Sequence, residues 1–229
     1  MKTIKKMLSI SVCLALIMSY VPMVSITGSA AATDVTVTID TGTSVTLRDA
    51  DSNGYYEIGT ADELYAFAQI VNNGNNTING ELTADITVNE NVLTEDGELN
   101  GDGSNFRVWT PIGKGIHIYK GTFDGGEYTV RGLYFNNSNT TYVGLFGYVN
   151  GGTVKNVGVI VSYLYGDRYV GGVVGYNNGG TVSNCSNTGA VSGNYSVGGV
   201  VGCNSGGTVS NCSNTGAVSG SSYYAGGVV

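Results

Sequence analysis

Residues that could act as catalytic acids, bases or nucleophiles are sparse in this chain. His117 is the only histidine among the 229 residues, so neither a Ser-His-Asp arrangement nor a histidine-rich metal site can draw on a second one. Asp124, Glu127 and Arg131 fall close together in the sequence, and paired carboxylates can cleave glycosidic bonds. Two glycines follow Asp124, however, and a turn explains that pattern. We therefore expect no catalytic residues and no cofactor.

A second group of polar residues has the composition of a calcium-binding loop. Its members are Asp96, Glu98, Asn100 and Gly101. A calcium loop ends in a carboxylate ligand, but Arg107 occupies that position here. Because Asn, Asp and Gly tolerate left-handed backbone conformations, turns explain the segment without an ion. We expect no metal site.

Tyrosines offer a different chemistry, because their rigid amphipathic rings bind ligands at low entropic cost. Several tyrosines gather at the joints of a sequence repeat, and they form the candidate ligand-binding surface. They are Tyr142, Tyr169, Tyr195, Tyr223 and Tyr224. Together with nearby asparagines, we expect them to bind a host glycan or protein, or a cell-wall polymer.

The repeat that carries these tyrosines covers residues 142–229. Its copies share Gly144, Gly172, Gly199 and Gly227, so the period is 27–28 residues, which is typical of a solenoid. Val, Thr and Tyr cluster between Gly, Asn and Ser, and this pattern predicts short strands joined by turns. A unit this short must stack on its neighbours to bury its apolar face. The repeat therefore predicts an all-β fold, a parallel β-helix (β-solenoid) with coils of 27–28 residues.

Equivalent residues of successive coils should stack about 4.8 Å apart. The aligned sets are Val154, Val182 and Val209, then Asn156, Asn184 and Asn211, then Val157, Cys185 and Cys212. Because valine fills the last position in the first copy, we expect Cys185 and Cys212 to pack as thiols, although a disulfide between them is geometrically possible. Cys203 replaces Tyr148 and Tyr176 and leaves an odd thiol.

Residues 59–141 are expected to cap the solenoid and to form its first coils, with the parallel strands starting near residue 79. Thr60-Ala-Asp-Glu63 is a capping box that begins a helix over residues 60–73. The helix carries Leu64, Phe67, Ala68 and Val71 on one apolar face. Such a face can cover the first coil, which would otherwise expose its core and its strand edge.

The segments before the repeat also contain patterns that predict strands and core positions. Residues 33–58 contain a pair of short alternating strands around Gly42, and the sequence leaves open whether they belong to the solenoid. In the first coils, the apolar residues expected to point inward are Ile112, Phe123, Val130 and Leu133. Trp109, the only tryptophan, is expected to fill the core rather than to bind a sugar.

Residues 1–32 have the layout of a secretory signal peptide. Lys2, Lys5 and Lys6 precede an apolar run, and small residues follow with an Ala30-x-Ala32 cleavage site. We therefore expect the mature protein to be exported, and not to be an integral membrane protein.

Gly144-Leu-Phe-Gly147 is followed by Gly151-Gly-Thr-Val-Lys-Asn156, and later copies carry Gly172-Val-Val-Gly175 and Gly199-Val-Val-Gly202 at the same place. These residues resemble the GLUG-motif repeat family of bacterial secreted and cell-surface proteins. The sequence Trp109-Thr-Pro-Ile-Gly113 resembles the segment that precedes the repeats in such proteins. The family is defined by a structural repeat, so the resemblance implies fold and location rather than activity. Some members precede immunoglobulin-A-cleaving peptidase domains, but no peptidase motif is present here.

The distribution of charge limits the possible partners. All but one of the 17 acidic residues lie at or before Glu127. From Tyr142 onward the only charged residues are Lys155, Asp167 and Arg168. Nucleic acids and anionic lipids require basic patches, so we expect neither as a partner.

The sequence thus favours a secreted bacterial cell-surface repeat protein, a non-catalytic module for adhesion, ligand binding or spacing. One alternative is a β-helix carbohydrate-active enzyme, which needs a carboxylate cluster that the repeat lacks. Another is the repeat region of a larger surface peptidase. Val229 falls in the middle of a repeat, and we therefore expect further repeats and an anchor or effector domain beyond it.

Overall fold

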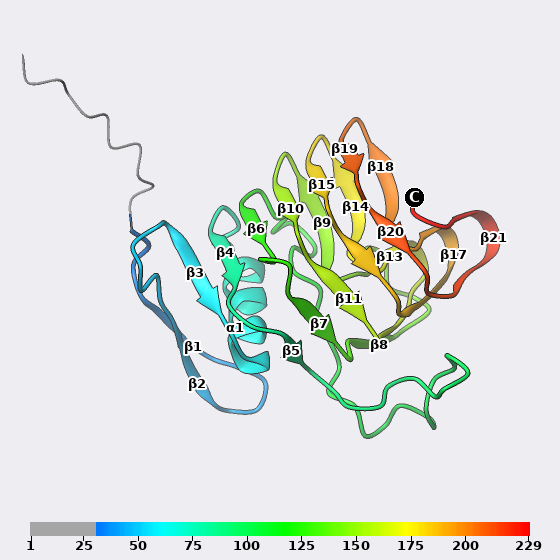
Figure 1. The fold of residues 1–229 in the computed structure, drawn as a ribbon, viewed down its shortest axis with the longest axis horizontal. Coiled ribbons are helices and arrows are strands. Elements are labelled where there is room, and N and C mark those ends of the chain that lie inside the picture. Colours follow the sequence, from blue (N-terminus) through cyan, green and yellow to red (C-terminus); the bar gives the residue numbers. More distant parts are fainter. Residues whose placement is uncertain (1–30) are drawn as a thin grey trace, which may run out of the picture.

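The computed structural model describes residues 31–229, and the strands stack into a parallel β-solenoid of about six coils (Figure 1). Within this range one helix lies at the N-terminal end of the coils. The predicted fold class is therefore confirmed. Residues 1–30 of the predicted signal peptide lie outside the described part of the chain.

Four parallel sheets form the walls of the solenoid. In spatial order, the first wall contains β19 (Thr208–Ser210), β15 (Thr181–Ser183), β10 (Thr153–Lys155), β6 (Thr122–Asp124), β4 (Asn79–Leu82) and β3 (Tyr55–Ile58). The second wall contains β20 (Ser213–Asn214), β16 (Ser186–Asn187), β11 (Gly158–Ile160), β7 (Thr129–Arg131) and β5 (Ile86–Thr87). The third contains β13 (Arg168–Gly171), β17 (Ala190–Gly198), β12 (Tyr163–Tyr165) and β8 (Tyr134–Asn136), with β21 (Val218–Gly226) paired to β17. The fourth contains β18 (Val201–Ser205), β14 (Val174–Asn178) and β9 (Phe146–Asn150).

The register of these walls places equivalent residues of successive copies side by side. Val154 pairs with Val182, and Val182 pairs with Val209, as the repeat predicts. The first two are fully buried, and Val209 in the last complete copy packs partly buried against the same core. In the third wall, β17 is long enough to pair with β12 through its first half and with β13 through its second half. The repeat period therefore determines which side chains stack.

The parallel strands begin earlier than the expected start near residue 79. β3, over Tyr55–Ile58, already pairs in parallel with β4, and helix α1 (Ala61–Asn72) is the connection between these two strands. The predicted strand pair of the lead-in is present as β1 (Val35–Thr38) and β2 (Ser44–Leu47), which are antiparallel and outside the coils. The lead-in of residues 33–58 thus contributes its last strand to the first coil.

Helix α1 begins with the predicted capping box. Thr60 Oγ1 accepts a hydrogen bond from the Glu63 N–H at 3.3 Å, and the Glu63 carboxylate accepts one from the Gly59 N–H at 2.9 Å. The Phe67 ring lies 5.8 Å from that of Phe123 and 6.2 Å from that of Tyr119, so α1 covers the end of the coil interior.

The helix is buried on more than the single apolar face that its sequence predicts. Tyr65 and Ile70 are buried together with the predicted apolar residues. The Tyr65 ring lies 5.0 Å from that of Trp109, and β1 and β2 pack against α1. Gln69 Nε2 donates to the Thr38 carbonyl at 2.9 Å and ties the helix to β1. In Figure 1 the helix stands between this strand pair and the first coils.

The core of the first coils contains the residues expected there. Ile112, Phe123, Val130 and Leu133 are fully buried. Trp109 is fully buried too, and its Nε1 donates to the Gly144 carbonyl at 3.0 Å, so it fills the core.

The asparagine and cysteine positions also stack. Asn184 Nδ2 donates to Asn156 Oδ1 at 2.9 Å, as expected for adjacent coils. Among the described residues, Cys185, Cys203 and Cys212 are free thiols. Cys185 is buried, and its Sγ donates to the Ser183 carbonyl at 3.2 Å.

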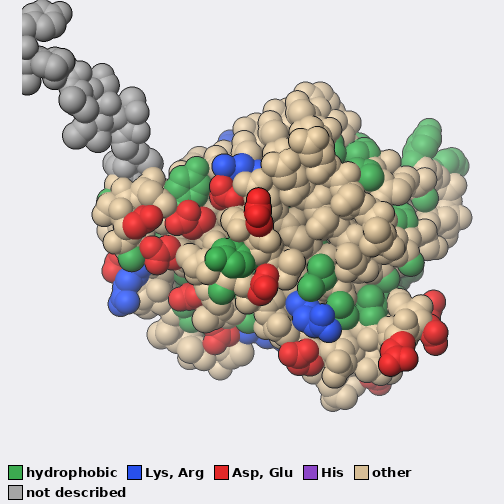
Figure 2. Space-filling view, viewed as in Figure 1, with side chains coloured by type: hydrophobic (Ala, Val, Ile, Leu, Met, Phe, Trp, Pro, Cys, Tyr) green, Lys and Arg blue, Asp and Glu red, His purple; other side chains and the backbone are tan. Residues whose placement is uncertain are grey.

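Charged side chains are unevenly distributed on the surface. Figure 2 shows acidic side chains over the N-terminal elements and on a protruding loop, whereas the visible repeat surface is mostly uncharged. This agrees with the sequence, in which residues 142–229 contain only three charged side chains, Lys155, Asp167 and Arg168.

Candidate functional site

Successive coils place four equivalent residues at one corner, which we call the corner column. Its members are Tyr142, Tyr169, Ser196 and Tyr224, with φ of 68°, 54°, 50° and 35°. Each directly precedes a residue of one ladder, in which Val143, Val170, Val197 and Ala225 pair from coil to coil. A left-handed backbone is costly for a bulky residue, and such strain is concentrated at functional sites. Three tyrosines at this corner therefore mark a candidate site.

The other two predicted tyrosines stand in a separate, adjacent column. Arg168 pairs in register with Tyr195, which pairs with Tyr223. The two tyrosine rings stack with centroids 5.3 Å apart, and the Arg168 guanidinium lies 4.4 Å from the Tyr195 ring centre. Tyr223 and Tyr224 have ring centroids 6.2 Å apart, so the two columns meet in the last coil. The structure thus divides the five predicted residues between two neighbouring columns.

The corner column joins two tyrosines of the fourth wall to form a cluster of four rings. Tyr142 stacks on Tyr169 with centroids 5.4 Å apart and planes 14° apart. Tyr148 and Tyr176, which pair in register, approach within 4.8 Å and lie against the first two rings. Burial, reinforced by the neighbouring hydroxyl and thiol groups, raises the pKa of Tyr142, so its ring stays neutral at physiological pH.

Sequence reasoning did not include Tyr148 and Tyr176 in the site. Their alignment with Cys203 was visible in the repeat, but only the paired strands show that they reach the corner column.

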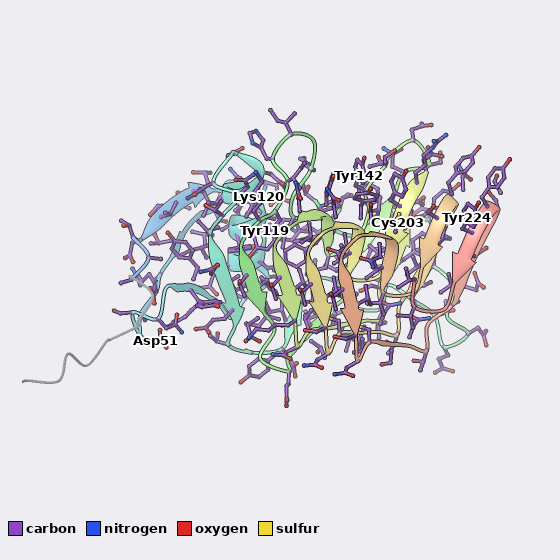
Figure 3. All side chains as sticks on the ribbon, turned by 90° about the horizontal axis from the view of Figure 1, so that it is seen from above. Asp51, Tyr119, Lys120, Tyr142, Cys203 and Tyr224 are labelled. Atoms are coloured by element: carbon purple, nitrogen blue, oxygen red, sulfur yellow. The ribbon has the colours of Figure 1, made fainter. Side chains whose placement is uncertain are left out.

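The third copy of the repeat, which begins at Ser196, interrupts this cluster. Ser196 stands where the previous coils have Tyr142 and Tyr169, and Cys203 stands where they have Tyr148 and Tyr176. A hollow of about 490 Å³ opens beside these two small residues. It is lined by Ser196, Val197, Gly202, Cys203, Asn204, Tyr224, Ala225, Gly226 and Val229. Figure 3 shows Tyr142, Cys203 and Tyr224 along one edge of the solenoid.

The charged groups near the adjacent column neutralise one another. Arg168 Nε lies 3.3 Å from the Asp167 carboxylate. Asn194 Nδ2 donates to Asp167 Oδ1 at 3.0 Å, and Ser221 Oγ donates to Asn194 Oδ1 at 2.8 Å. The tyrosine surface therefore presents ring faces, hydroxyls and amides with little net charge.

The carboxylates considered for catalysis lie elsewhere and have other partners. Asp124 forms an ion pair with Lys155 at 2.8 Å and accepts a hydrogen bond from Asn156 Nδ2 at 2.9 Å. Burial raises the pKa of Asp124, but the Lys155 ammonium and the other donors outweigh burial and hold the pKa below its usual range. Arg131 pairs with Glu90 instead, at 3.7 Å. This arrangement keeps Asp124 ionised and serves to join adjacent coils.

A group of acidic residues that the sequence did not predict lies near the first coil. Carboxylate oxygens of Asp51, Glu57 and Glu81 all lie within 4.8 Å of one another. Asn53 Nδ2 donates to Asp51 at 3.1 Å and to Glu81 at 3.0 Å. The signal was the pairing of Glu57 with Glu81 in β3 and β4, which sequence reasoning did not align. The residues Asp96 and Glu98 of the suspected calcium loop are not part of this group.

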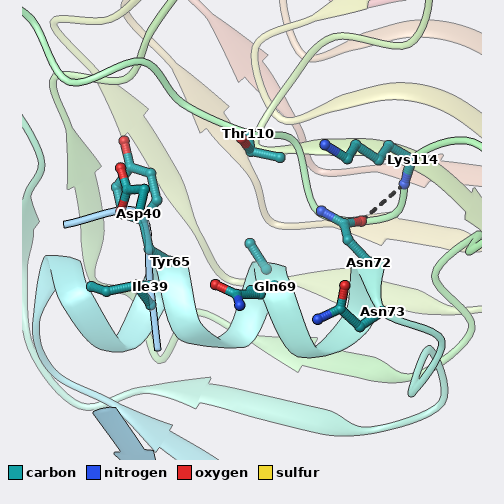
Figure 4. A pocket seen from close by; sticks show the side chains of 9 residues that line it. Ile39, Asp40, Tyr65, Gln69, Asn72, Asn73, Thr110 and Lys114 are labelled. Carbon is teal, nitrogen blue, oxygen red and sulfur yellow. Dashed lines mark hydrogen bonds between the residues drawn. The ribbon is translucent and has the colours of Figure 1, made fainter. Parts of the chain in front are cut away.

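A pocket of about 230 Å³ lies beside helix α1 (Figure 4). Asn72 Oδ1 accepts hydrogen bonds from the Gly113 N–H at 2.9 Å and the Lys114 N–H at 3.1 Å, and Asn72 Nδ2 donates to the Pro111 carbonyl at 3.0 Å. Gln69 in the same pocket bonds to Thr38. The side-chain amides in this pocket thus already hold α1 to its neighbours, and we assign the pocket a structural role.

No helix within residues 31–229 is both long and apolar enough to cross a membrane. No curated protein matches the chain.

A solved structure with a similar fold is described as that of "a putative immunoglobulin A1 protease from Bacteroides ovatus". The TM-score is 0.51 at 20% sequence identity, and the match covers 76% of this chain and 60% of that chain. At this identity the likeness concerns the fold alone. The present chain thus spans less than two thirds of that protein.

The repeat itself matches a known family model. Residues 166–192 and 193–219 each match the GLUG motif. Both segments contribute to the corner column, through Tyr169 and Ser196. The prediction of GLUG-motif repeats is therefore confirmed over residues 166–219.

Proposed function

We propose that this chain is an exported, non-catalytic module of a bacterial cell-surface protein, and that its tyrosine columns bind a glycan or protein ligand. The observation that carries the proposal is the corner column, where tyrosines occupy strained left-handed positions in three of the four repeat copies. A structural role alone would favour Gly or Asn at such positions, because they adopt this backbone at lower cost. The proposal of export rests on the predicted N-terminal signal peptide, and the GLUG repeats support a location at the cell surface.

The chemistry around the columns supports binding rather than catalysis. The nearest charged pair, Asp167 and Arg168, is internally neutralised, and Asp124 is paired with Lys155. Catalytic acids and bases require pKa values near the working pH, whereas pairing holds the pKa of Asp124 below its usual range. A spacer role is compatible with binding, because successive coils extend the molecule along one axis.

A glycan and protein array probed with the exported chain tests this proposal. The test variant is Tyr142→Ser combined with Tyr169→Ser, because Ser196 shows that the corner accepts serine. We expect a bound ligand whose signal falls at least tenfold in the variant. The matched control is Tyr165→Ser, since Tyr165 pairs with Ser192 on another part of the coil. Binding that is equal in both variants, or depolymerisation of a bound polysaccharide, would contradict the proposal.

A further inference from the structure

Two cysteines occupy the same position in adjacent coils. Ser186 pairs in parallel register with Ser213, and Cys185 and Cys212 stand directly before these two residues. The Ser213 N–H donates to the Cys185 carbonyl at 3.0 Å, so the pairing extends to the cysteines. Paired parallel strands lie about 4.8 Å apart, which falls inside the range of roughly 4.4–6.8 Å between the Cα atoms of a disulfide. The backbone therefore already holds the two cysteines at a bonding distance.

The two side chains also share one orientation. The residue before each cysteine is an asparagine with φ of 53°, so the backbone turns the same way at both corners. Cys185 Sγ lies 3.2 Å from the Ser183 carbonyl oxygen, and Cys212 Sγ lies 3.2 Å from the equivalent oxygen of Ser210. Cys212 Sγ also approaches the carbonyl oxygen of Val182, in the coil of Cys185, at 3.8 Å. The Cys212 sulfur therefore lies on the side of its coil that faces Cys185.

The two thiols influence each other's ionisation. Hydrogen bonding with Cys212, reinforced by burial, raises the pKa of the Cys185 thiol. Hydrogen bonding with Cys185 outweighs burial and lowers the pKa of the Cys212 thiol. Such effects require neighbouring sulfur atoms, and a lowered pKa supplies the thiolate that attacks a disulfide. Cys203 differs from this pair, because its register partner in the preceding coil is Tyr176.

We propose that Cys185 and Cys212 form a cross-linking site, and that their oxidation joins two adjacent coils through a disulfide. The co-reactant is a disulfide, R–S–S–R, of a small molecule or a protein. The Cys212 thiolate attacks one of its sulfurs and releases R–S⁻, which takes up a proton, and a mixed disulfide remains. Cys185 then loses its proton, attacks the Cys212 sulfur and displaces the second R–S⁻, which becomes the second thiol. The two cysteines lose two electrons and two protons in total, and the co-reactant gains both.

The cross-link holds one copy of the repeat closed. The chain between Cys185 and Cys212 contains strands β16 to β19, and its length is one repeat period. A disulfide stabilises mainly by restricting the unfolded chain. Opening of this coil therefore becomes less favourable in the oxidised protein, and the packed thiols of the structure are the reduced form of the pair. The inference does not depend on ligand binding by the tyrosine columns.

Peptide mapping of the exported Cys203→Ser variant tests this site, because the variant keeps the pair and removes the third thiol. The folded protein is treated with glutathione disulfide, and the remaining thiols are alkylated in denaturant. Chymotrypsin then cleaves after Tyr195, between the two cysteines. We expect monomeric protein to yield a linked peptide pair that separates on reduction. The matched control carries Cys212→Val in addition, since Val157 fills this position in an earlier coil.

Thermal unfolding provides a second measurement, which cysteines that only pack as thiols would not change. We expect the oxidised Cys203→Ser protein to melt about 5–10 °C above its reduced form, because a loop of this length is closed. The control with Cys212→Val should melt at the same temperature under both conditions. The parent protein, treated alike, should give the same linked peptides and retain Cys203 as the one thiol open to alkylation.

Several results would overturn the cross-link. They are full alkylation of both cysteines after oxidation, glutathione retained on either cysteine as a stable mixed disulfide, and disulfides formed only between molecules. Links to Cys203 that equal the expected link in the parent would also contradict it. So would an oxidised form that melts no higher than the reduced form, because the bond would then strain the corner. None of these results bears on ligand binding by the tyrosine columns, which the array tests separately.

Discussion

Asparagine side chains at two positions pass hydrogen bonds from coil to coil. Asn187 Nδ2 donates to Asn214 Oδ1 at 2.8 Å, and Asn177 Nδ2 donates to Asn204 Oδ1 at 2.8 Å. Within residues 31–229, Asn177 Oδ1 is the one buried side-chain nitrogen or oxygen without a partner. Both Asn177 and Asn187 follow a valine in the preceding coil, but Asn187 Oδ1 accepts a hydrogen bond from the Gly189 N–H at 3.1 Å, whereas Asn177 Oδ1 has no such donor. The two buried asparagines therefore differ in how much they stabilise the fold.

Replacing each of these asparagines by valine should separate the two cases. Asn187→Val removes both bonds between the side chain and Gly189 as well as the bond to Asn214, and should cost about 2–4 kcal/mol. Asn177→Val should change stability by less than about 1 kcal/mol, because Asn204 is exposed and the Gly180 carbonyl keeps the Thr208 N–H as a donor. Urea unfolding of both variants measures the difference, and equal losses would contradict this account.

Asp49 makes the N-terminal elements sensitive to acid. Burial raises the pKa of Asp49, but the N–H groups of Ala32, Gly54 and Asn53 outweigh burial and hold the pKa below its usual range. A carboxyl with a lowered folded-state pKa stabilises the protein above its unfolded pKa, and this contribution is lost as pH falls through the folded value. We expect the melting temperature to drop below about pH 4. Asp49→Asn should lower it at pH 7 and flatten the acid dependence; an unchanged pH profile would count against this role.

The sequence predicted the chemical type of the candidate site better than its arrangement. Tyr223 and Tyr224 are neighbours in the chain, yet the left-handed backbone at Tyr224 places them in different columns. Side-chain alternation alone does not reveal such a change of direction, because it depends on the local φ value.

At the scale of elements, helix α1 has the largest effect on the first coil. Its Phe67 is fully buried against Phe123 and Tyr119, and a Cβ atom on Gly80 would lie only 2.7 Å from the Phe67 ring. Glycine at position 80 therefore lets β4 pass close beneath the helix. The helix and the first coil form one packed unit.

A charge in this unit should expose the end of the solenoid. We expect Phe67→Asp to unfold α1 and to cause aggregation through the uncovered strand edge of β3. Gln69→Ala, which removes one bond to β1 at a partly exposed position, is the control and should remain monomeric. Size-exclusion chromatography with light scattering distinguishes the two. A monomeric Phe67→Asp variant with the parent's melting temperature would show that the helix does not cover the coils.

Elements with a strong local signal were predicted well. Thr60 and Glu63 form the cap that their spacing indicates, and the period of the repeat gives the correct register. The pairing of β3 with β4 was missed because α1 separates them in the sequence, and no repeat marks Tyr55–Ile58. The additional buried surface of α1 was missed because it depends on the packing of β1, β2 and Trp109, all of which are long-range contacts.

At the scale of the whole molecule, the coils hold one another through bonds that run along the solenoid axis. The Thr181 N–H donates to the Gly152 carbonyl at 2.9 Å, and the Thr208 N–H donates to the Gly180 carbonyl at 2.8 Å, each linking one coil to the next. The N-terminal elements and the end of β21 lie at opposite ends of this axis (Figure 1). A pull on the two ends therefore stretches these bonds along their own direction.

This geometry has a mechanical consequence. Tension along the axis should peel the coils away one at a time from the end, instead of shearing many bonds together. Each coil of 27–28 residues would release about 90 Å of chain at about 3.3 Å per residue. Force spectroscopy should show a series of small, evenly spaced steps, whereas a single rupture of the whole array would contradict this expectation. If the proposed ligand binding holds, a load on the bound ligand would meet a tether that lengthens in increments.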